Sequence, residues 1–223
     1  MRYDRNFQFV FTHPYLYESL AEEYPRLFER IRERSREKRW ETEGAMWVEA
    51  DCNITGGESL VRQLLYGKAY LQKYFDVDSR ILWLPDTFGF TAALPQIMKK
   101  SGVDYLLTAK LTRNDTNRWP YDSFRWRGID GSEVLVSTAM AIDCEELERG
   151  RFDTKVNGRL TPAETLGAWR RYQQKDCSDT ALFTYGFGDG GGGPIREDLE
   201  NLGRMQAGIP GLPRIKTQTA GEY

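Results

Sequence analysis

Apolar residues in this chain fall into short unbroken runs that alternate with longer segments of helical spacing. Short β-prone runs bounded by polar or turn residues are typical of buried strands. We predict strands at 7–12, 45–48, 80–84, 105–108 and 181–185. Two further strands, 124–126 and 134–137, are joined through Gly128-Ile129-Asp130-Gly131 and are predicted to form a β-hairpin.

Between these runs, apolar residues recur every three or four positions, as they do on one face of an amphipathic helix. The first such face consists of Leu20, Tyr24, Leu27, Phe28 and Ile31. Further helices are predicted at 58–75, from Thr91 through Met98, and at 195–207. Thr161-Pro162-Ala163-Glu164 has the pattern of a capping box, which predicts a helix to about Gln174. The polar stretch 143–159 is predicted to be a loop or lid.

Strands separated by helices predict one α/β domain over residues 1–223, with a mostly parallel sheet and helices packed outside it. The hairpin is an insertion into that alternation. Periodicity does not distinguish an open sheet from a barrel.

Composition and charge narrow the class of protein. The net charge is −2, from 31 Lys+Arg against 33 Asp+Glu, so we predict no nucleic-acid partner, because phosphate binding needs a gathered positive surplus. No apolar stretch approaches the roughly 20 residues of a membrane span, so no membrane association is predicted. Cys52, Cys144 and Cys177 lie far apart and form no CxxC pair, which favours a reducing, cytoplasmic setting.

Three predicted loops at strand ends carry acids together with small residues, and they contain Asp51, Asp86 and Asp189. Ligands bind at the carboxyl ends of strands in parallel α/β folds, so neighbouring strands would bring these acids to one rim. Helix capping is the alternative for Asp51 and Asp86. Asp86 lies about five residues before its predicted helix, too early for a cap, which favours a functional role.

The glycine-rich loop after the strand at 181–185 has two interpretations. Gly186-x-Gly188-x-x-Gly191 matches the dinucleotide fingerprint, which makes a nucleotide-binding α/β protein one alternative. The fingerprint also expects an acid about 20 residues further on, after the next strand, and the candidate strand 214–218 carries none. The lone histidine, His13, is interpreted as a structural residue.

Several segments in order along the chain resemble family 38 glycoside hydrolases, the retaining α-mannosidases, of the cytosolic and bacterial branch. The matching segments are Gly44-Ala45-Met46-Trp47-Val48-Glu49-Ala50-Asp51-Cys52-Asn53, Gly57-Glu58-Ser59-Leu60-Val61-Arg62-Gln63, Trp83-Leu84-Pro85-Asp86-Thr87-Phe88-Gly89-Phe90, Leu94-Pro95-Gln96-Ile97, Leu107-Thr108-Ala109-Lys110, Trp126-Arg127-Gly128-Ile129-Asp130-Gly131 and Gly186-Phe187-Gly188-Asp189. The resemblance covers almost the whole chain.

The resemblance implies a seven-stranded (β/α) barrel in which a zinc ion binds the hydroxyls of a terminal mannose. It implies that Asp86 is the nucleophile and a zinc ligand, and that Asp189 is the general acid/base. Retaining glycosidases need two such carboxyl groups about 5–5.5 Å apart. Trp47, Asp51, Asn53 and Phe88 are predicted to bind the substrate, a mannose-containing oligosaccharide.

The chain also departs from the family pattern. The family's histidine-containing zinc motif near its start and its later zinc-binding histidine have no counterpart here. We therefore expect an incomplete barrel that lacks its first and last strands, with the other zinc ligands outside this chain. Open sheet edges then favour self-association. The alternative function is a non-catalytic, truncated fragment that at most binds sugar.

Overall fold

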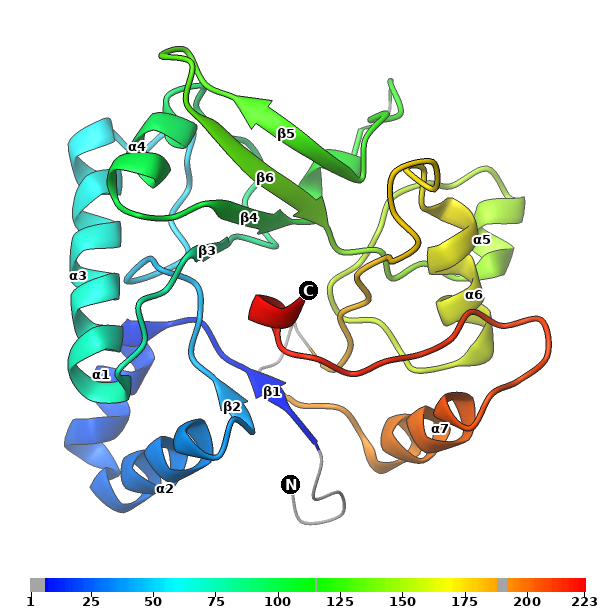
Figure 1. The fold of residues 1–223 in the computed structure, drawn as a ribbon, viewed down its shortest axis with the longest axis horizontal. Coiled ribbons are helices and arrows are strands. Elements are labelled where there is room, and N and C mark those ends of the chain that lie inside the picture. The colour runs from blue at the N-terminus through cyan, green and yellow to red at the C-terminus, as the bar shows by residue number, and fades with distance from the viewer. Residues whose placement is uncertain (1–6, 115, 188–191) are drawn as a thin grey trace.

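The computed structural model describes residues 7–114, 116–187 and 192–223, and its strands form two sheets (Figure 1). In the smaller sheet β1 (Phe9–Val10) runs parallel to β2 (Trp40–Glu41). The larger sheet has the order β3-β4-β6-β5. Its members are β3 (Ile81–Trp83), β4 (Tyr105–Thr108), β5 (Ser123–Arg127) and β6 (Glu133–Thr138). β3, β4 and β6 are parallel, and β5 pairs antiparallel with β6.

Isolated backbone contacts extend the parallel pairing beyond the two sheets. Gly44 forms a parallel bridge with Leu82, which connects the segment after β2 to β3. On the far side, the amide of Met140 donates to the carbonyl of Leu182 over 3.0 Å. The strands therefore follow one another laterally in the order in which the chain visits them, apart from the β5–β6 hairpin.

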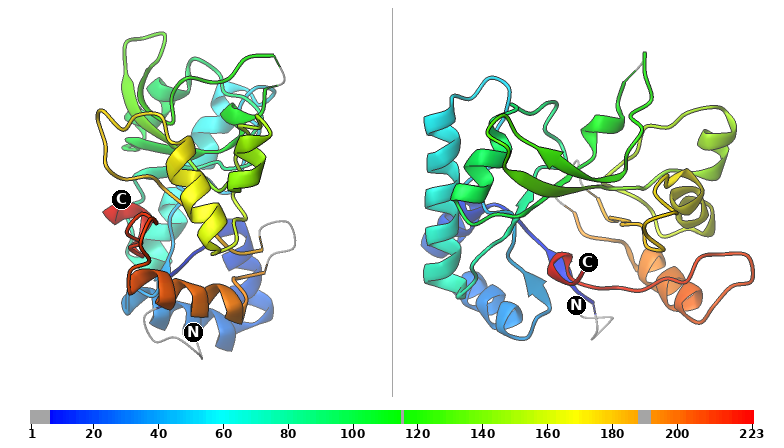
Figure 2. Two further views of the ribbon diagram at one scale, coloured as in Figure 1. Left: turned by 90° about the vertical axis from the view of Figure 1, so that its right-hand side faces the viewer. Right: turned by 45° about the horizontal axis from the view of Figure 1, so that its top comes forward.

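Helices pack on the outside of these strands at both ends of the molecule (Figures 1 and 2). One group is α1 (Pro14–Glu23), α2 (Pro25–Arg36), α3 (Gly57–Phe75) and α4 (Leu94–Lys100). The other group is α5 (Cys144–Glu148), α6 (Pro162–Arg171) and α7 (Arg196–Gln206). Two short 3₁₀ helices are η1 (Lys110–Thr112) and η2 (Ala220–Glu222). Within the described part of the chain, every helix is too short or too polar to span a bilayer.

The main core lies between α3, α4 and the larger sheet. Leu60 and Leu64 of α3, Leu82 of β3, Met98 of α4 and Val136 of β6 are almost fully buried there. Burying a large aliphatic side chain contributes about 1.5–3 kcal/mol. The predicted helix at 58–75 and the predicted strands at 80–84 and 105–108 are thus confirmed, together with the hairpin.

The single amphipathic helix predicted around 20–31 is wrong, because the structure has two helices there. Tyr24 has φ −133° and ψ 58°, and Pro25 starts α2. Proline has no amide hydrogen and its ring clashes with the preceding turn, so the helix ends before it. Tyr17 of α1 and Phe28 and Ile31 of α2 still join one aromatic cluster. Leu20 also packs against this cluster, whereas Tyr24 and Leu27 of the predicted face are exposed, so the face is confirmed only in part.

Two predicted strands are absent as strands. At 45–48 the backbone turns, since Gly44 has φ 115° and Ala45 has φ 58°, and the strand lies earlier, at β2. At 181–185 the chain makes a single parallel bridge, from Tyr185 to Gly158, and isolated hydrogen bonds. No strand forms at 214–218 either. The first predicted strand, 7–12, is present in the shorter form of β1.

The segment 143–159 is not entirely a loop, because α5 begins after Asp143, whose side chain accepts from the amide of Glu145. The predicted capping box at α6 forms on one side. Thr161 Oγ1 accepts from the Glu164 amide over 3.2 Å, but the Glu164 carboxylate accepts from the Arg159 amide instead. This helix ends at Arg171, three residues short of the prediction.

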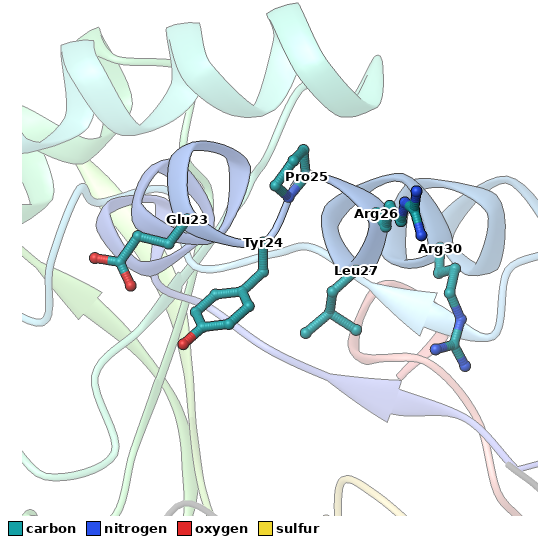
Figure 3. A pocket seen from close by; sticks show the side chains of 6 residues that line it. All are labelled: Glu23, Tyr24, Pro25, Arg26, Leu27 and Arg30. Carbon is teal, nitrogen blue, oxygen red and sulfur yellow. The ribbon is translucent and has the colours of Figure 1, made fainter.

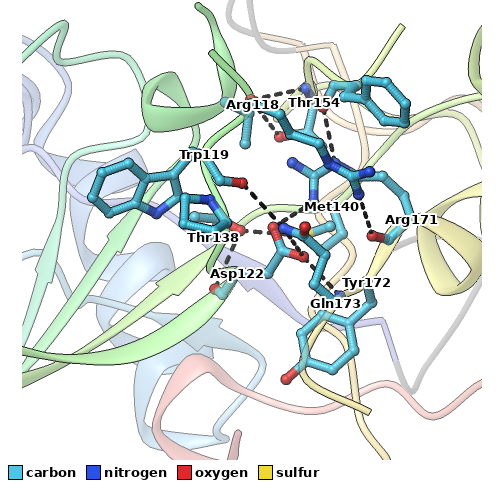
Figure 4. A network of polar contacts seen from close by, with 12 residues as sticks. Arg118, Trp119, Asp122, Thr138, Met140, Thr154, Arg171, Tyr172 and Gln173 are labelled. Atoms are coloured by element: carbon cyan, nitrogen blue, oxygen red, sulfur yellow. Dashed lines mark hydrogen bonds and ion pairs between the residues drawn. The ribbon is translucent and has the colours of Figure 1, made fainter. Parts of the chain in front are cut away.

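A buried polar network joins the hairpin to α6 (Figure 4). Asp122 and Arg171 form an ion pair in which both side chains are 0% exposed. The other Asp122 oxygen accepts from the Gln173 amide over 2.9 Å, and Arg171 Nε donates to the Phe152 carbonyl over 2.9 Å. Buried charges need such partners to offset their loss of hydration.

Candidate active site

Asp86 and Lys110 lie side by side because of the register between β3 and β4. Leu84 donates its amide to the carbonyl of Leu107 over 2.9 Å, and Ala109 donates to that of Pro85 over 3.2 Å. The parallel pairing therefore continues past both strands to the residues just before Asp86 and Lys110. This end is the carboxyl end of the strands, where α/β folds bind ligands.

The ammonium group of Lys110 forms an ion pair with Oδ1 of Asp86. The Asp86 side chain is 55% exposed and the Lys110 side chain 11% exposed. The Asp86 carboxyl group therefore faces solvent, whereas Lys110 is largely covered by protein. The ammonium nitrogen also lies 4.8 Å from the centre of the Phe88 ring. Phe88 is largely exposed. A carboxyl group is thus available at the surface next to an exposed aromatic ring.

Glu49 holds the backbone of Asp86, because its Oε1 accepts from the Asp86 amide over 2.8 Å. Its other oxygen lies 4.0 Å from Nε2 of His13. Burial raises the pKa of Glu49 above its ordinary value, and burial lowers the pKa of His13. A neutral His13 agrees with its interpretation as a structural residue.

The loop that contains Asp51 and Asn53 lies against the Asp86 loop. Cys52 bridges Phe90 in parallel, and the Cys52 carbonyl accepts from the Thr91 amide over 3.2 Å. A Cβ atom on Gly89 would lie 1.9 Å from Nδ2 of Asn53. A side chain at 89 would therefore displace the exposed Asn53 side chain, whose amide occupies that space. Asn53 and Phe88 thus belong to adjoining loops.

Asp51 has a local structural task. Its Oδ1 accepts from the amides of Asn53 and Ile54 over 2.8 and 2.9 Å, which is the hydrogen-bond pattern of an Asx turn. The Asp51 residue is exposed.

The Trp47 ring packs toward the helices. It makes edge contacts with Tyr15, at 6.3 Å between ring centres, and with Tyr70, at 5.6 Å. It belongs to the aromatic cluster of α1, α2 and α3. Its predicted role in substrate binding remains a prediction.

Asp189, the predicted general acid/base, lies outside the described residues, as do its neighbours 188, 190 and 191. The helix that follows, α7, is capped from within the chain. Asp198 is fully buried, and its Oδ2 accepts from the Ile195 amide over 3.1 Å. This contact satisfies one of the amides at the N-terminus of the helix. The nucleotide-binding alternative is not tested by it.

The sequence resemblance implies a zinc ion. Whether this chain can hold one depends on how its His, Cys, Asp and Glu side chains are placed. Catalytic zinc usually has three protein ligands. Among residues 7–114, 116–187 and 192–223, no group of three or more His, Cys, Asp or Glu side chains is placed to hold a metal ion. One oxygen of Asp86 faces Lys110. The described residues therefore do not fit a zinc site by themselves, and no chemical step is assigned to the ion.

Lys110 and Glu49 received no role from the sequence, although both lie in segments that carry the resemblance. A positional signal for Lys110 was present. It follows the strand at 105–108 by two residues, as Asp86 follows the strand at 80–84, and adjacent parallel strands bring such positions together.

Residues 1–223 match the family described as glycosyl hydrolases family 38 N-terminal domain. The chain belongs to this family. It is 34% identical over 223 residues to alpha-mannosidase G of Dictyostelium discoideum, covering 100% of the chain and 19% of that relative. It is 36% identical over 221 residues to alpha-mannosidase 2C1 of Homo sapiens, covering 96% of the chain and 19% of that relative. The chain thus spans about a fifth of the length of these curated relatives.

Solved structures agree on the fold. An alpha-mannosidase from Enterococcus faecalis V583 superposes with a TM-score of 0.69 at 17% identity, over 97% of this chain and 24% of that one. A 4-alpha-glucanotransferase from Thermococcus litoralis superposes with a TM-score of 0.52 at 16% identity, over 81% of this chain and 27% of that one. The α/β class with mostly parallel strands is confirmed.

Proposed function

We propose that this chain is part of a catalytic domain that hydrolyses terminal α-linked mannose with retention of configuration, and that Asp86 is its nucleophile. The observation that carries the proposal is the exposed Asp86 carboxylate at the end of β3, paired with Lys110 and held through its backbone by Glu49. Membership of family 38 and relatives that are alpha-mannosidases support the choice of sugar. The parallel order of the strands is compatible with a partial (β/α) barrel, which is part of the proposal.

In the proposed reaction, the Asp86 carboxylate attacks the anomeric carbon of the mannoside while the bond to the leaving oxygen breaks. Asp189 donates a proton to that oxygen. Water then attacks the anomeric carbon while Asp189 accepts its proton, and the bond between that carbon and Asp86 breaks, which releases mannose and restores the Asp86 carboxylate. Lys110 forms an ion pair with Asp86, which positions the carboxylate before attack. The family resemblance adds zinc, which would hold sugar hydroxyls with help from ligands beyond the described residues.

Covalent trapping tests the nucleophile. A 5-fluoro-mannosyl fluoride should leave a sugar on the enzyme, and peptide mapping of the polypeptide that contains this chain should find it on Asp86. The Asp86→Asn variant is the control and should remain unlabelled. A sugar attached to another carboxylate would contradict the assignment.

A second measurement tests Asp189. Asp189→Ala should slow mannosides with poor leaving groups far more than activated aryl mannosides, because only the former need strong protonation of the departing oxygen. Equal losses on both kinds of substrate would assign Asp189 a structural role in the glycine loop.

A cytoplasmic setting belongs to the proposal as well. All three cysteines are free, with Cys52 buried and Cys177 exposed. Cell fractionation that finds the protein in a secretory compartment would contradict it.

A further inference from the structure

A groove with aromatic walls lies on the outer face of the molecule, between α1 and α3. Its volume is about 370 Å³, within the range of small-ligand sites. It is lined by Glu18, Trp47, Tyr66, Ala69, Tyr70, Lys73 and Tyr74. Tyr66, Tyr70 and Tyr74 recur every four residues along α3, so they share one face of that helix. Four aromatic rings therefore line one hollow.

The rings are fixed in place by contacts with each other. The centres of the Tyr70 and Tyr74 rings lie 4.4 Å apart, and Trp47 meets Tyr70 edge-on at 5.6 Å. The ammonium of Lys73 lies 4.7 Å from the centre of the Tyr74 ring. A ligand that enters the groove meets walls that are already ordered, which reduces the entropy cost of binding.

The groove also contains polar groups that can bind hydroxyls. The hydroxyl of Tyr70 is not one of them, because its oxygen is itself buried. The charges of Glu18 and Lys73 line the same hollow.

We propose that this groove is a second carbohydrate-binding site, separate from the Asp86 site, that takes a mannose unit of the oligosaccharide substrate. The choice of mannose rests on the proposed function. A sugar ring offers an apolar face to Tyr66 and Trp47 and hydroxyls to Glu18 and Lys73, which is the combination that the groove provides. Such a site would keep a branched substrate on the protein between hydrolytic events.

Calorimetric titration of the 223-residue chain with an α-linked mannotriose tests the proposal, with Asp86→Asn as background so that the probe is not hydrolysed. Tyr66→Ser should weaken binding about tenfold, the effect expected for one lost aromatic contact. Lys73→Met should weaken it by a smaller factor. The matched control is Tyr24→Ser, since Tyr24 is 58% exposed and Tyr66 54%, and Tyr24 lines a different hollow, at the α1–α2 junction (Figure 3). The control should bind like the parent.

The outcomes separate this inference from the proposed function. Equal affinity in Tyr66→Ser and Tyr24→Ser, or no binding of mannotriose by the parent chain, overturns the second site. Binding that Tyr66→Ser leaves intact and Asp86→Ala abolishes also overturns it, while supporting the Asp86 site. Binding that depends on Tyr66, combined with no mannosidase activity in the complete polypeptide that retains Asp86, supports the groove and contradicts the proposed function. Tighter binding of tetramethylammonium than of mannotriose would identify the groove as a cation site and overturn the sugar assignment.

Discussion

Two pairs of aspartate with a basic residue show how the same chemistry serves different ends in different parts of this molecule. Asp86 and Lys110 meet at the ends of β3 and β4, where the carboxylate is 55% exposed. Asp122 and Arg171 meet between the hairpin and α6, where both side chains are 0% exposed. Each pair joins segments far apart in the sequence, but only the first leaves its carboxylate accessible to a ligand.

The difference lies in what surrounds each carboxylate. The Asp122 carboxylate accepts from Arg171 and from the backbone and side chain of Gln173, so both of its oxygens are engaged within the protein. In Asp86, by contrast, Lys110 contacts mainly one carboxylate oxygen, Oδ1. A buried pair whose carboxylate is engaged on both oxygens fixes structure, whereas an exposed one engaged mainly on one oxygen is available for chemistry.

The largest expected effect is on turnover at the exposed pair. Asp86→Asn should lower mannoside turnover by roughly four orders of magnitude or more, because it removes the proposed nucleophile. Its free energy of unfolding should change by about 1 kcal/mol or less, since exposed ion pairs contribute little. Steady-state kinetics and chemical denaturation of the active polypeptide measure both. A loss of turnover that is explained entirely by unfolding would remove the distinction between the two pairs.

The next effect is on stability at the buried pair. Arg171→Met should lower the free energy of unfolding by about 3–5 kcal/mol, because Asp122 then remains buried without its cation. The double variant Arg171→Met/Asp122→Leu is the control and should recover part of that loss, since no buried charge remains. Urea denaturation followed by circular dichroism measures both variants. Equal stability of Arg171→Met and the parent would show that the buried pair is dispensable.

A third carboxyl, Glu43, is largely buried and accepts from the Ser79 hydroxyl over 2.5 Å. Burial raises the pKa of Glu43 to about 7, above its ordinary value near 4.5. Glu43 therefore contributes fully to the free energy of unfolding below pH 4.5, and this contribution is lost as pH rises through 7. The reason is that the Glu43 carboxyl ionises at lower pH in the unfolded chain than in the folded one. Relative to Glu43→Gln, the parent should lose up to about 3 kcal/mol across that window. Denaturation at pH 4.5, 6 and 8 tests this, and parallel pH profiles would contradict it.

The smallest expected effect is on stability when the cation of the exposed pair is removed. Lys110→Met should change the free energy of unfolding by about 1 kcal/mol or less, because Asp86 can be hydrated without its partner. Arg171→Met, measured under the same conditions, is the matched comparison. A loss at Lys110 as large as that at Arg171 would show that exposure of the carboxylate does not distinguish the two pairs.

The sequence by itself determined the elements whose signals are local. The strand at 105–108 and the helix at 58–75 carry enough periodic apolar residues to be identified, and the hairpin has its turn residues in place. The motif around Asp86 led to the family, which the comparisons confirmed. Short apolar runs were less informative, because 45–48 and 181–185 have the composition of strands but form turns and irregular segments.

Tertiary structure alone decided which side chains meet. Lys110 reaches Asp86 through the register of β3 and β4, and Arg171 reaches Asp122 across 49 residues of sequence. It also directed the Trp47 ring into the groove between α1 and α3. The physical reason is that local propensity acts over a few residues, whereas register and packing depend on how distant segments exclude water together.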